Sequence, residues 1–290
     1  GDVNPSGRTI DTFVYDLTQT PTANNFGNFN YTNMDEFKAS SFGADTIPAF
    51  VNYVEGIYVG YKFYETAAAE GLIDYDKTVV YPFGRGLSYT TFTQTLNSVT
   101  EADGTITVDV TVTNTGSASG KEVVEVYYNP PYTNGGIEKA TANLIGFAKT
   151  SELAPGASED VTVTFQAEDM ASYDTYGKGC YVLEKGDYVI SINADSHTVL
   201  DSKTYNVAST IVYDESNPRS TDAEAATTKF DFADDKLVTL SRADHFANYV
   251  PQRRPTQDDR QDHRSHAGYG RGYVDAGPAD PFQAETYDGF

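Results

Sequence analysis

The sequence contains one cysteine, Cys180, and no tryptophan in 290 residues. A single cysteine excludes an intramolecular disulfide, a zinc site built from several cysteines and an iron–sulfur cluster. Long apolar runs are also missing: none approaches the ~18 residues of a membrane span, and no charged-then-apolar signal segment opens the chain. We therefore expect no metal, no cofactor and no membrane partner. The compartment stays open between the cytoplasm and the cell surface or exterior.

Positive charge is scarce in this chain. Its 20 Lys and Arg residues are outnumbered by 42 Asp and Glu residues, which gives a formal net charge of −22 and a sequence pI of about 4.3. A protein that binds nucleic acid or anionic membranes through a basic face needs the opposite balance, so we expect no nucleic-acid partner. At ~150 residues per domain, the length predicts two domains.

Residues 1–87 predict the end of an α/β layer rather than a complete domain. Helix-forming residues fill Tyr61–Glu70, and Gly71 follows where a C-cap glycine is typical. Ile57–Val59 is β-branched and aromatic, which favours an extended conformation. One helix and two or three short strands are too few to enclose a core of their own.

Residues 88–213 predict an all-β domain. Apolar and polar side chains alternate with the period of a strand that has one buried face. The expected strands are 105–113, 122–128, 161–165, 188–192 and 204–212. Turn signals such as Asn114-Thr115-Gly116 separate them. Six or seven short strands in about 125 residues are typical of an immunoglobulin-like β-sandwich.

The remainder of the chain changes character twice. Residues 214–250 form a polar, acidic connection that ends in a short apolar segment from Leu237. Residues 251–290 contain five of the nine arginines, no lysine and almost no aliphatic side chain. This composition predicts a largely disordered tail of low order.

Three stretches carry a family resemblance. They are Asn4-Pro5-Ser6-Gly7-Arg8, the run from Tyr53 to Tyr64 (YVEGIYVGYKFY), and the run from Tyr81 to Phe92 (YPFGRGLSYTTF). In this order and spacing they resemble consecutive motifs of family-3 glycoside hydrolases, of the β-glucosidase type. The resemblance covers residues 1–213 and implies that 1–87 are the C-terminal part of an α/β sandwich domain. It implies a fibronectin type III-like sandwich at 88–213. Lys62 departs from the arginine usual in the family.

A second resemblance concerns the segment Leu237–Asp244. It is similar to the region before the (β/α)₈ barrel in bacterial members whose sandwich and fibronectin-like domains precede the barrel. On this interpretation 214–250 lead toward a missing barrel, which would be a domain partner, and the chain is a slice of a longer enzyme. The tail after Pro251 then derives either from a reading-frame change or from a divergent linker.

The resemblance also implies where catalysis occurs in the parent enzyme. Retaining glycosidases use two carboxyl groups about 5–5.5 Å apart. In this family the nucleophile is an Asp on the barrel, and the acid/base is a Glu on a sandwich-domain loop before the Asn-Pro-Ser-Gly motif. Neither position falls within residues 1–290, so we predict no catalytic residue and no activity for the isolated chain. The parent's substrate would be a β-glucoside or oligosaccharide.

A few residues merit inspection on their own chemistry. Glu55 lies in a dense aromatic run where burial could raise its pKa, although a structural role is expected. Arg85, in a Phe-Gly-Arg-Gly turn, could reach a substrate-side loop, but a turn or interface role is expected. Gly84 and Gly86 form too short a pattern for a phosphate loop. Asn30-Tyr31-Thr32 matches the N-glycosylation pattern, which matters only in a glycosylating secretory pathway.

The histidine and serine candidates are weaker still. His263 and His266 have an H-x-x-H spacing without helical context or a nearby carboxylate, so we expect solvated side chains. Ser6 and Ser88 lack the His–Asp partners of a hydrolase triad in the neighbouring sequence.

Two functional hypotheses remain. The first is an accessory, inactive fragment of a β-glucosidase. The second is a non-catalytic β-sandwich module for carbohydrate binding or adhesion, which the absence of tryptophan disfavours, although 22 tyrosines could provide flat aromatic faces. The aromatic run Tyr53–Tyr64 is expected to face solvent or pack on the sandwich, and exposure there would promote self-association.

Overall fold

The computed structural model describes residues 2–22, 53–224, 226 and 238–249. The chain divides into two compact units. The first unit comprises Gly1–Tyr15, Ile57–Thr228 and Arg242–His245, and the second comprises Asp16–Gly56, Lys229–Ser241 and Phe246–Phe290. Nearly all regular secondary structure of the described residues belongs to the first unit, while the 3-10 helix η1 (Leu17–Gln19) belongs to the second. The predicted low-order tail, 251–290, lies outside the described residues.

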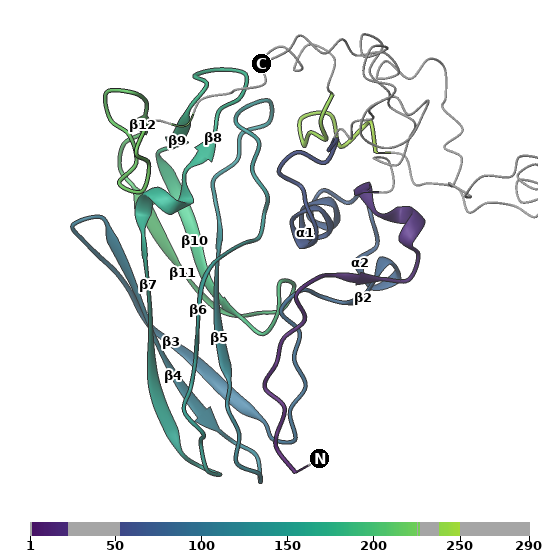
Figure 1. Ribbon diagram of the computed structural model, residues 1–290, viewed down its shortest axis with the longest axis vertical. Helices are drawn as coiled ribbons and strands as arrows, with labels where there is room; N and C mark the ends of the chain where they lie inside the picture. Colours follow the sequence, from purple (N-terminus) through teal and green to yellow (C-terminus); the bar gives the residue numbers. More distant parts are fainter. Residues whose placement is uncertain (1, 23–52, 225, 227–237, 250–290) are drawn as a thin grey trace, which may run out of the picture. The chain divides into compact units, whose positions relative to one another are not determined.

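Two antiparallel sheets form the body of the first unit, and they face each other in Figure 1. One sheet has the order β11–β10–β5–β6 and the other the order β3–β4–β7. The strands of the four-stranded sheet are β5 (Val123–Asn129), β6 (Asn143–Lys149), β10 (Gly186–Asn193) and β11 (Val199–Val207). Those of the three-stranded sheet are β3 (Phe92–Ala102), β4 (Thr105–Asn114) and β7 (Ser158–Gln166).

A third sheet, of order β12–β9–β8, closes one end of the sandwich region. Its strands are β8 (Ser172–Tyr173), β9 (Tyr181–Leu183) and β12 (Ile211–Tyr213), and the 3-10 helix η4 (Ala167–Met170) joins β7 to β8. The sequence pattern predicted one strand over 204–212, which is wrong. The structure instead assigns this stretch to β11 and β12, which pair with β10 and β9 in different sheets. The chain must therefore bend between them, and the Thr210 hydroxyl accepts a 3.0 Å hydrogen bond from the Lys185 N–H at this bend.

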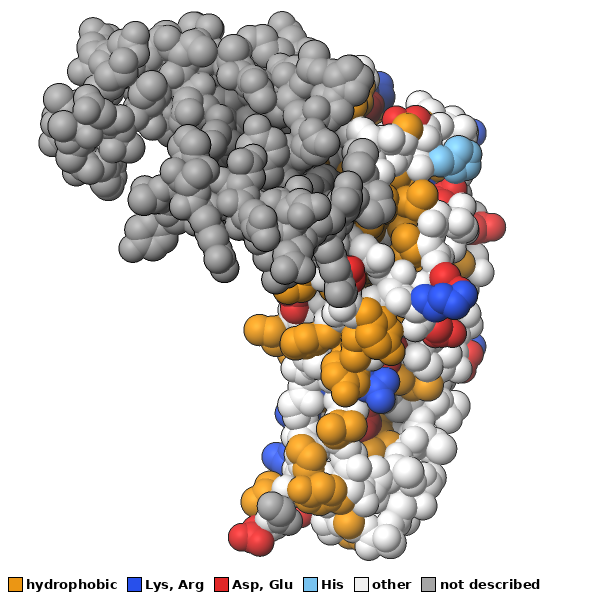
Figure 2. Space-filling view, turned by 90° about the vertical axis from the view of Figure 1, so that its right-hand side faces the viewer, with side chains coloured by type: hydrophobic (Ala, Val, Ile, Leu, Met, Phe, Trp, Pro, Cys, Tyr) orange, Lys and Arg blue, Asp and Glu red, His pale blue; other side chains and the backbone are white. Residues whose placement is uncertain are grey.

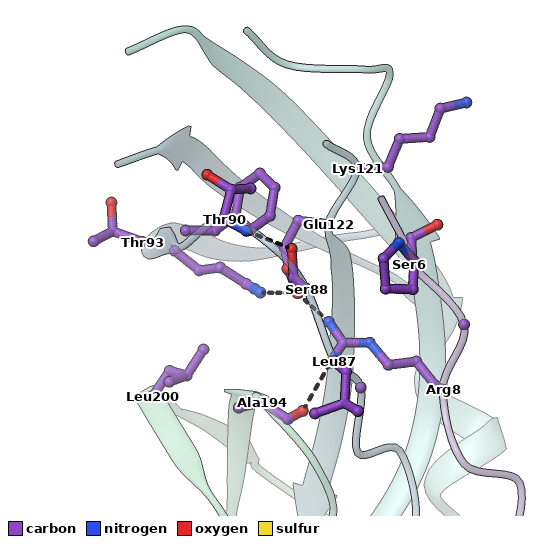
Figure 3. A pocket seen from close by; sticks show the side chains of 15 residues that line it. Ser6, Arg8, Leu87, Ser88, Thr90, Thr93, Lys121, Glu122, Ala194 and Leu200 are labelled. Atoms are coloured by element: carbon purple, nitrogen blue, oxygen red, sulfur yellow. Dashed lines mark hydrogen bonds and ion pairs between the residues drawn. The ribbon is translucent and has the colours of Figure 1, made fainter. Parts of the chain in front are cut away.

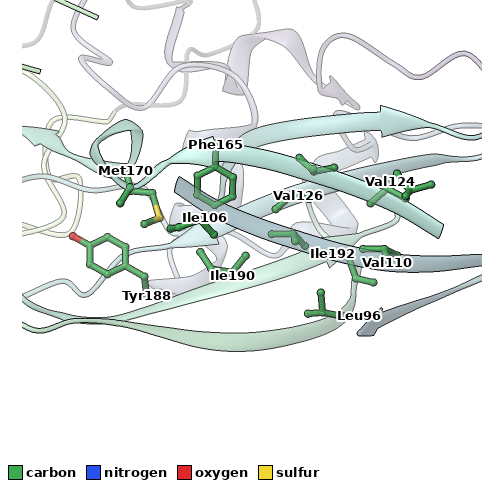
Figure 4. Packing of buried hydrophobic residues seen from close by; sticks show 14 of the residues in the cluster. Leu96, Ile106, Val110, Val124, Val126, Phe165, Met170, Tyr188, Ile190 and Ile192 are labelled. Atoms are coloured by element: carbon green, nitrogen blue, oxygen red, sulfur yellow. The ribbon is translucent and has the colours of Figure 1, made fainter. Parts of the chain in front are cut away.

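The core of the sandwich follows from the alternation of apolar residues. Burial alternates along the whole of β4, and its four inward-facing apolar side chains are fully buried: Ile106, Val108, Val110 and Val112. Figure 4 shows Leu96, Val126 and Ile190 from other strands converging on the same layer. Each such aliphatic side chain stabilises the fold by about 1.5–3 kcal/mol relative to an exposed one. The predicted β-sandwich is thus confirmed.

The segment before the sandwich carries helix α1 (Tyr61–Ala69), helix α2 (Tyr75–Thr78) and a two-stranded sheet of β1 (Phe13–Val14) and β2 (Val79–Tyr81). Helix α1 ends as predicted. Gly71 has φ +73°, the Leu72 N–H donates to the Ala67 carbonyl at 2.8 Å, and the Gly71 N–H donates to the Ala68 carbonyl at 3.0 Å. This pair of hydrogen bonds is the Schellman motif, which places glycine at the left-handed position.

The aromatic run before α1 is not extended at its front. Ile57 lies in a turn, because Gly56 and Gly60 on either side adopt left-handed backbone angles, φ +54° and +58°. Exposure within the run is mixed. Tyr58 and Phe63 are fully buried, whereas 64% of Tyr53 is exposed.

The fold class is therefore a short α+β segment followed by an all-β, immunoglobulin-like sandwich, as predicted. Residues on both sides of the predicted boundary at 87/88 belong to the first compact unit. Among the described residues, no helix is long and apolar enough to cross a membrane.

Candidate functional site

Two of the sequence motifs lie side by side in the first unit. We call the residues Asn4–Arg8 together with Pro82–Tyr89 the motif junction. Thr9, next to the first motif, donates its N–H to the Arg85 carbonyl at 2.9 Å and accepts from the Gly84 N–H at 2.9 Å. Its hydroxyl donates to the Pro82 carbonyl at 2.6 Å. Arg8 and Gly86 form an antiparallel bridge. Short backbone ladders therefore hold together motifs that are far apart in the sequence.

Asn4 attaches the motif junction to the sandwich. Its amide nitrogen donates to the Ser119 carbonyl at 3.1 Å. Its amide oxygen accepts from the Ser88 hydroxyl at 3.1 Å and from the Tyr89 N–H at 2.9 Å. One short side chain thus satisfies groups from two distant segments, which explains why an amide is suited to this place.

Arg8 makes the charged contact of the motif junction. Its guanidinium forms an ion pair and hydrogen bond with Glu122, donates to the Ala194 carbonyl at 3.5 Å and lies 3.9 Å from the Glu125 carboxylate. A Cβ on Gly86 would lie 2.6 Å from the Arg8 Nη1 atom, so the glycine leaves room for the guanidinium.

Glu125, on β5, is a buried carboxyl group in the same place, with only 4% of its surface exposed. Burial raises the pKa of Glu125 to about 7, although the hydrogen bond from the Tyr127 hydroxyl and the charge of Arg8 oppose the rise. The Tyr127 hydroxyl donates to Glu125 at 2.9 Å. Sequence inspection did not single out Glu125, because a glutamate among valines on a strand gives no sign of which face it occupies.

A cavity of about 380 Å³ opens beside the motif junction (Figure 3). The volume is within the range of about 300–1,000 Å³ typical of small-molecule sites. Figure 3 shows Arg8 pointing toward Glu122 at its centre, with Leu87 and Leu200 as apolar walls. Glu122 is the one carboxylate among the described lining residues, and it is already paired with Arg8. This cavity therefore does not present the pair of free carboxyl groups that a glycosidase uses.

A second ionisable cluster joins α1 and α2 to the turn between β10 and β11. Glu65, buried on α1, accepts from the Tyr75 hydroxyl at 2.6 Å and from the Ser196 hydroxyl at 2.8 Å, and its other oxygen lies 2.8 Å from Nδ1 of His197. The Tyr75 and His197 rings stack 3.6 Å apart. The hydrogen bond to Glu65 is the main cause that raises the pKa of His197.

This cluster contains serine, histidine and carboxylate, but its geometry is not that of a hydrolase. The Ser196 hydroxyl donates to Glu65 rather than to His197, so the serine–histidine hydrogen bond by which a triad activates its nucleophile is absent. Sequence inspection missed the cluster because Glu65 and His197 are 132 positions apart.

The sequence-predicted candidates occupy ordinary structural places. Glu55 is buried, with 3% exposed. Arg85 is exposed, with its guanidinium 5.3 Å from the centre of the Tyr81 ring. The Ser6 hydroxyl accepts from the Lys149 ammonium at 3.2 Å, and Ser88 is occupied by the Asn4 hydrogen bond.

Other candidates concern metal binding, glycosylation and redox chemistry. His263, His266 and the sequon at Asn30 lie outside the described residues. Within the described ranges, no group of three or more His, Cys, Asp or Glu side chains is arranged to hold a metal ion. Cys180 is buried, and its burial raises the pKa of the thiol.

Comparison with known proteins assigns the sandwich. The model of the fibronectin type III-like domain matches residues 122–196. Beta-glucosidase A of Butyrivibrio fibrisolvens is 36% identical over 234 residues, which are 74% of this chain and 25% of the relative. A beta-glucosidase of Ruminococcus albus is 33% identical, over 74% of this chain and 20% of the relative.

Solved structures agree with these relatives. A beta-glucosidase from Paenibacillus barengoltzii matches with a TM-score of 0.59 and 35% identity, over 73% of this chain and 21% of that chain. Beta-glucosidase 3B from Thermotoga neapolitana, in complex with α-D-glucose, matches with a TM-score of 0.57 and 32% identity, over 72% of this chain and 26% of that chain.

The sandwich is therefore a fibronectin type III-like domain of the kind that β-glucosidases contain, joined to the motif junction that precedes it. The chain belongs to glycoside hydrolase family 3, which confirms the resemblance seen in the three motifs. It spans a fifth to a quarter of the length of the curated relatives cited above.

Proposed function

We propose that this chain is an accessory, non-catalytic part of a retaining family-3 glycosidase that releases terminal β-D-glucosyl residues. The observation that carries the proposal is that its matches to β-glucosidases cover about three quarters of this chain but only a fifth to a quarter of theirs. The carboxylates of Glu122, beside the motif junction, and of Glu65, on α1, already have partners within the chain. Glu122 forms an ion pair with Arg8, and Glu65 accepts hydrogen bonds from Tyr75 and Ser196. On this proposal the isolated chain is inactive.

The accessory role we propose is to brace one domain against another. Residues 1–87 would be the end of an α/β sandwich domain, 88–213 the fibronectin-like domain, 214–250 a connection toward a barrel and 251–290 a tail. Asn4 and Arg8 bind the two sides of the proposed 87/88 boundary together through Ser119 and Glu122. The hydrogen-bonded junction would keep the fibronectin-like domain at a fixed place beside the substrate-binding domains.

A chimera tests this proposal directly. Residues 1–213 of this chain replace the matching segment of the Butyrivibrio fibrisolvens enzyme, and hydrolysis of an aryl β-glucoside is measured. The chimera should be active, and the isolated chain should not exceed a buffer control. Turnover by the purified chain alone would contradict the accessory role, and so would an inactive chimera that is folded.

The second candidate function is carbohydrate binding without catalysis. It is favoured by the cavity beside the motif junction, which is lined by hydroxyl, amide and charged side chains together with apolar walls. This mixture suits a sugar, which has polar edges and apolar faces. Calorimetric titration with glucose and cellobiose decides the matter: binding that is lost in Arg8→Ala but kept in Arg85→Ala would support it, and no heat of binding would reject it.

A further inference from the structure

Arg242 is a buried arginine in the segment that resembles the region before the barrel, and 9% of its surface is exposed. Its Nε and Nη2 atoms donate to one carboxylate oxygen of Glu70 at 2.9 and 2.6 Å. Its Nη1 atom donates to the backbone carbonyl of Lys139 at 2.9 Å. The guanidinium carbon lies 3.8 Å from the centre of the Tyr132 ring. The planar cation is thus bound along its edges and covered on a face.

The groups that receive Arg242 are held in place by contacts of their own. Glu70 caps the end of α1, where its N–H donates to the Thr66 carbonyl at 2.9 Å. Lys139 is 2% exposed, donates from Nζ to the Pro131 carbonyl at 2.7 Å and pairs with Glu184. These contacts do not involve Arg242, so they fix the backbone at Glu70 and the side chain of Lys139 independently of it.

The geometry selects guanidinium over ammonium. A guanidinium is flat, offers several N–H groups in one plane and stacks on aromatic rings, whereas an ammonium is a compact, strongly hydrated point charge. Here the carboxylate of Glu70 and the carbonyl of Lys139 lie at the edges of the cation while the Tyr132 ring lies against its face. A lysine at this position could satisfy one of these partners at a time.

We propose that Glu70, the Tyr132 ring and the Lys139 carbonyl form a guanidinium-binding site, and that its occupation by Arg242 holds the returning segment Arg242–His245 on the first unit. The chain leaves this unit after Thr228 and re-enters it at Arg242. Two backbone contacts complete the return: the Arg242 N–H donates to Glu138 at 3.1 Å, and the His245 N–H donates to the Arg242 carbonyl at 3.1 Å. The site would fix the point at which the chain leaves the first unit after His245. This role does not depend on any glycosidase activity.

Hydrogen exchange in the full chain with chemical rescue tests the site. In Arg242→Ala, the amides of Arg242–His245 should exchange about ten to a hundred times faster, because hydrogen bonds to a charged group are lost. Ethylguanidinium at millimolar concentration should restore their protection, whereas ethylammonium should not. Arg242→Lys should resemble the alanine variant. Rescue by both cations alike, or unchanged exchange in Arg242→Ala, would overturn the proposal.

Arg219 provides a matched control. Its guanidinium donates to Asp222 at 2.9 and 3.0 Å and lies 3.8 Å from the centre of the Tyr181 ring. Arg219 therefore also binds a carboxylate along its edge and an aromatic ring on its face. Arg219→Ala should leave the exchange of Arg242–His245 unchanged.

A second variant guards against general unfolding of Arg242→Ala, which would show as faster exchange in β4. If Arg242→Ala unfolds, the site is tested with Glu70→Gln instead, because this variant removes the negative charge that Arg242 binds while keeping the shape of the side chain. Exchange at Arg242–His245 should then increase while β4 stays protected. Wild-type protection of Arg242–His245 in Glu70→Gln would reject the site.

Discussion

Gly84 lies against the carboxyl group of Glu125, so closely that a Cβ on Gly84 would come within 2.9 Å of the Glu125 carboxyl carbon. Gly84 also has φ +82°, in the left-handed region where side chains are strained. The first glycine of the Phe-Gly-Arg-Gly turn is thus required for two independent reasons, one in its own backbone and one in its neighbour.

Gly84→Ala should therefore destabilise the fold more than an ordinary glycine replacement. The left-handed backbone costs about 1–2 kcal/mol for a residue with a Cβ, and overpacking against Glu125 adds about 1–3 kcal/mol. The control is Gly156→Ala, because Gly156 has φ +79° but no atom within 4 Å of an added Cβ. Urea unfolding should give the larger loss for Gly84→Ala, and equal losses would show that the contact with Glu125 is unimportant.

Glu125 should make stability fall as the pH rises. Its pKa is raised from the ordinary 4.5 to about 7 in the folded state, so between these values the folded protein holds a proton that the unfolded chain has released. Stability is then highest below the unfolded pKa and decreases up to about pH 7. Glu125→Gln removes this titration and should flatten the profile between pH 4.5 and 7. Urea unfolding at four pH values measures it, with the exposed Glu152→Gln as control; parallel profiles for wild type and Glu125→Gln would contradict the assignment.

His197 should titrate above its ordinary pKa of 6.5, chiefly because of the hydrogen bond to Glu65. A raised histidine pKa contributes stability that is complete below the unfolded pKa and is lost as the pH rises through the folded pKa. The contribution is expected to be below about 1 kcal/mol because the side chain is 43% exposed. An NMR titration of the His197 ring should show its pKa falling in Glu65→Gln. An unchanged pKa in that variant would exclude Glu65 as the cause.

Separate copies of the protein should associate through the first unit. Figure 2 shows hydrophobic side chains gathered on one face of the molecule. The strongly exposed hydrophobic residues that lie in the motif junction or close to it in sequence include Val3, Ile10, Phe13, Tyr15, Leu87 and Tyr89. Large exposed apolar patches normally mark an interaction surface. The net charge of −22 opposes association, so added salt should strengthen it by screening the repulsion.

Light scattering from 50 mM to about 1 M salt tests this expectation. The double variant Ile10→Glu, Leu87→Glu should scatter less, whereas Tyr176→Glu, at a side chain that is 78% exposed before β9, should not. A monomer that is indifferent to salt would show that these side chains do not drive contact between copies.

The sandwich could be predicted from the sequence because its information is local. The alternation over 105–113 needs no knowledge of partner strands, and Gly71 at the end of α1 is a signal within one turn of helix. The family resemblance likewise rests on short contiguous motifs. Where the signal is local but interrupted, the prediction fails: Ile57 is expected to be extended but lies in a turn, next to Gly56 with its positive φ.

The contacts of the site could not be predicted because they depend on three-dimensional proximity. Arg8 and Glu122 are 114 positions apart, and Arg242 and Glu70 are 172 apart. A charged residue in a sequence of 62 acidic and basic side chains does not reveal its partner, and burial of Glu125 depends on which face of β5 it occupies. Only the assembled strands and helices decide these pairings.

The separation between Arg8 and its partners has a consequence for the order in which the chain can fold during synthesis. At about 5–20 residues per second, roughly 6–23 s pass between the synthesis of Arg8 and that of Glu125. The carbonyl of Ala194 arrives later still. Throughout that interval the Arg8 guanidinium lacks its partners Glu122 and Glu125, so the first motif reaches its final surroundings only after these later residues have been synthesised.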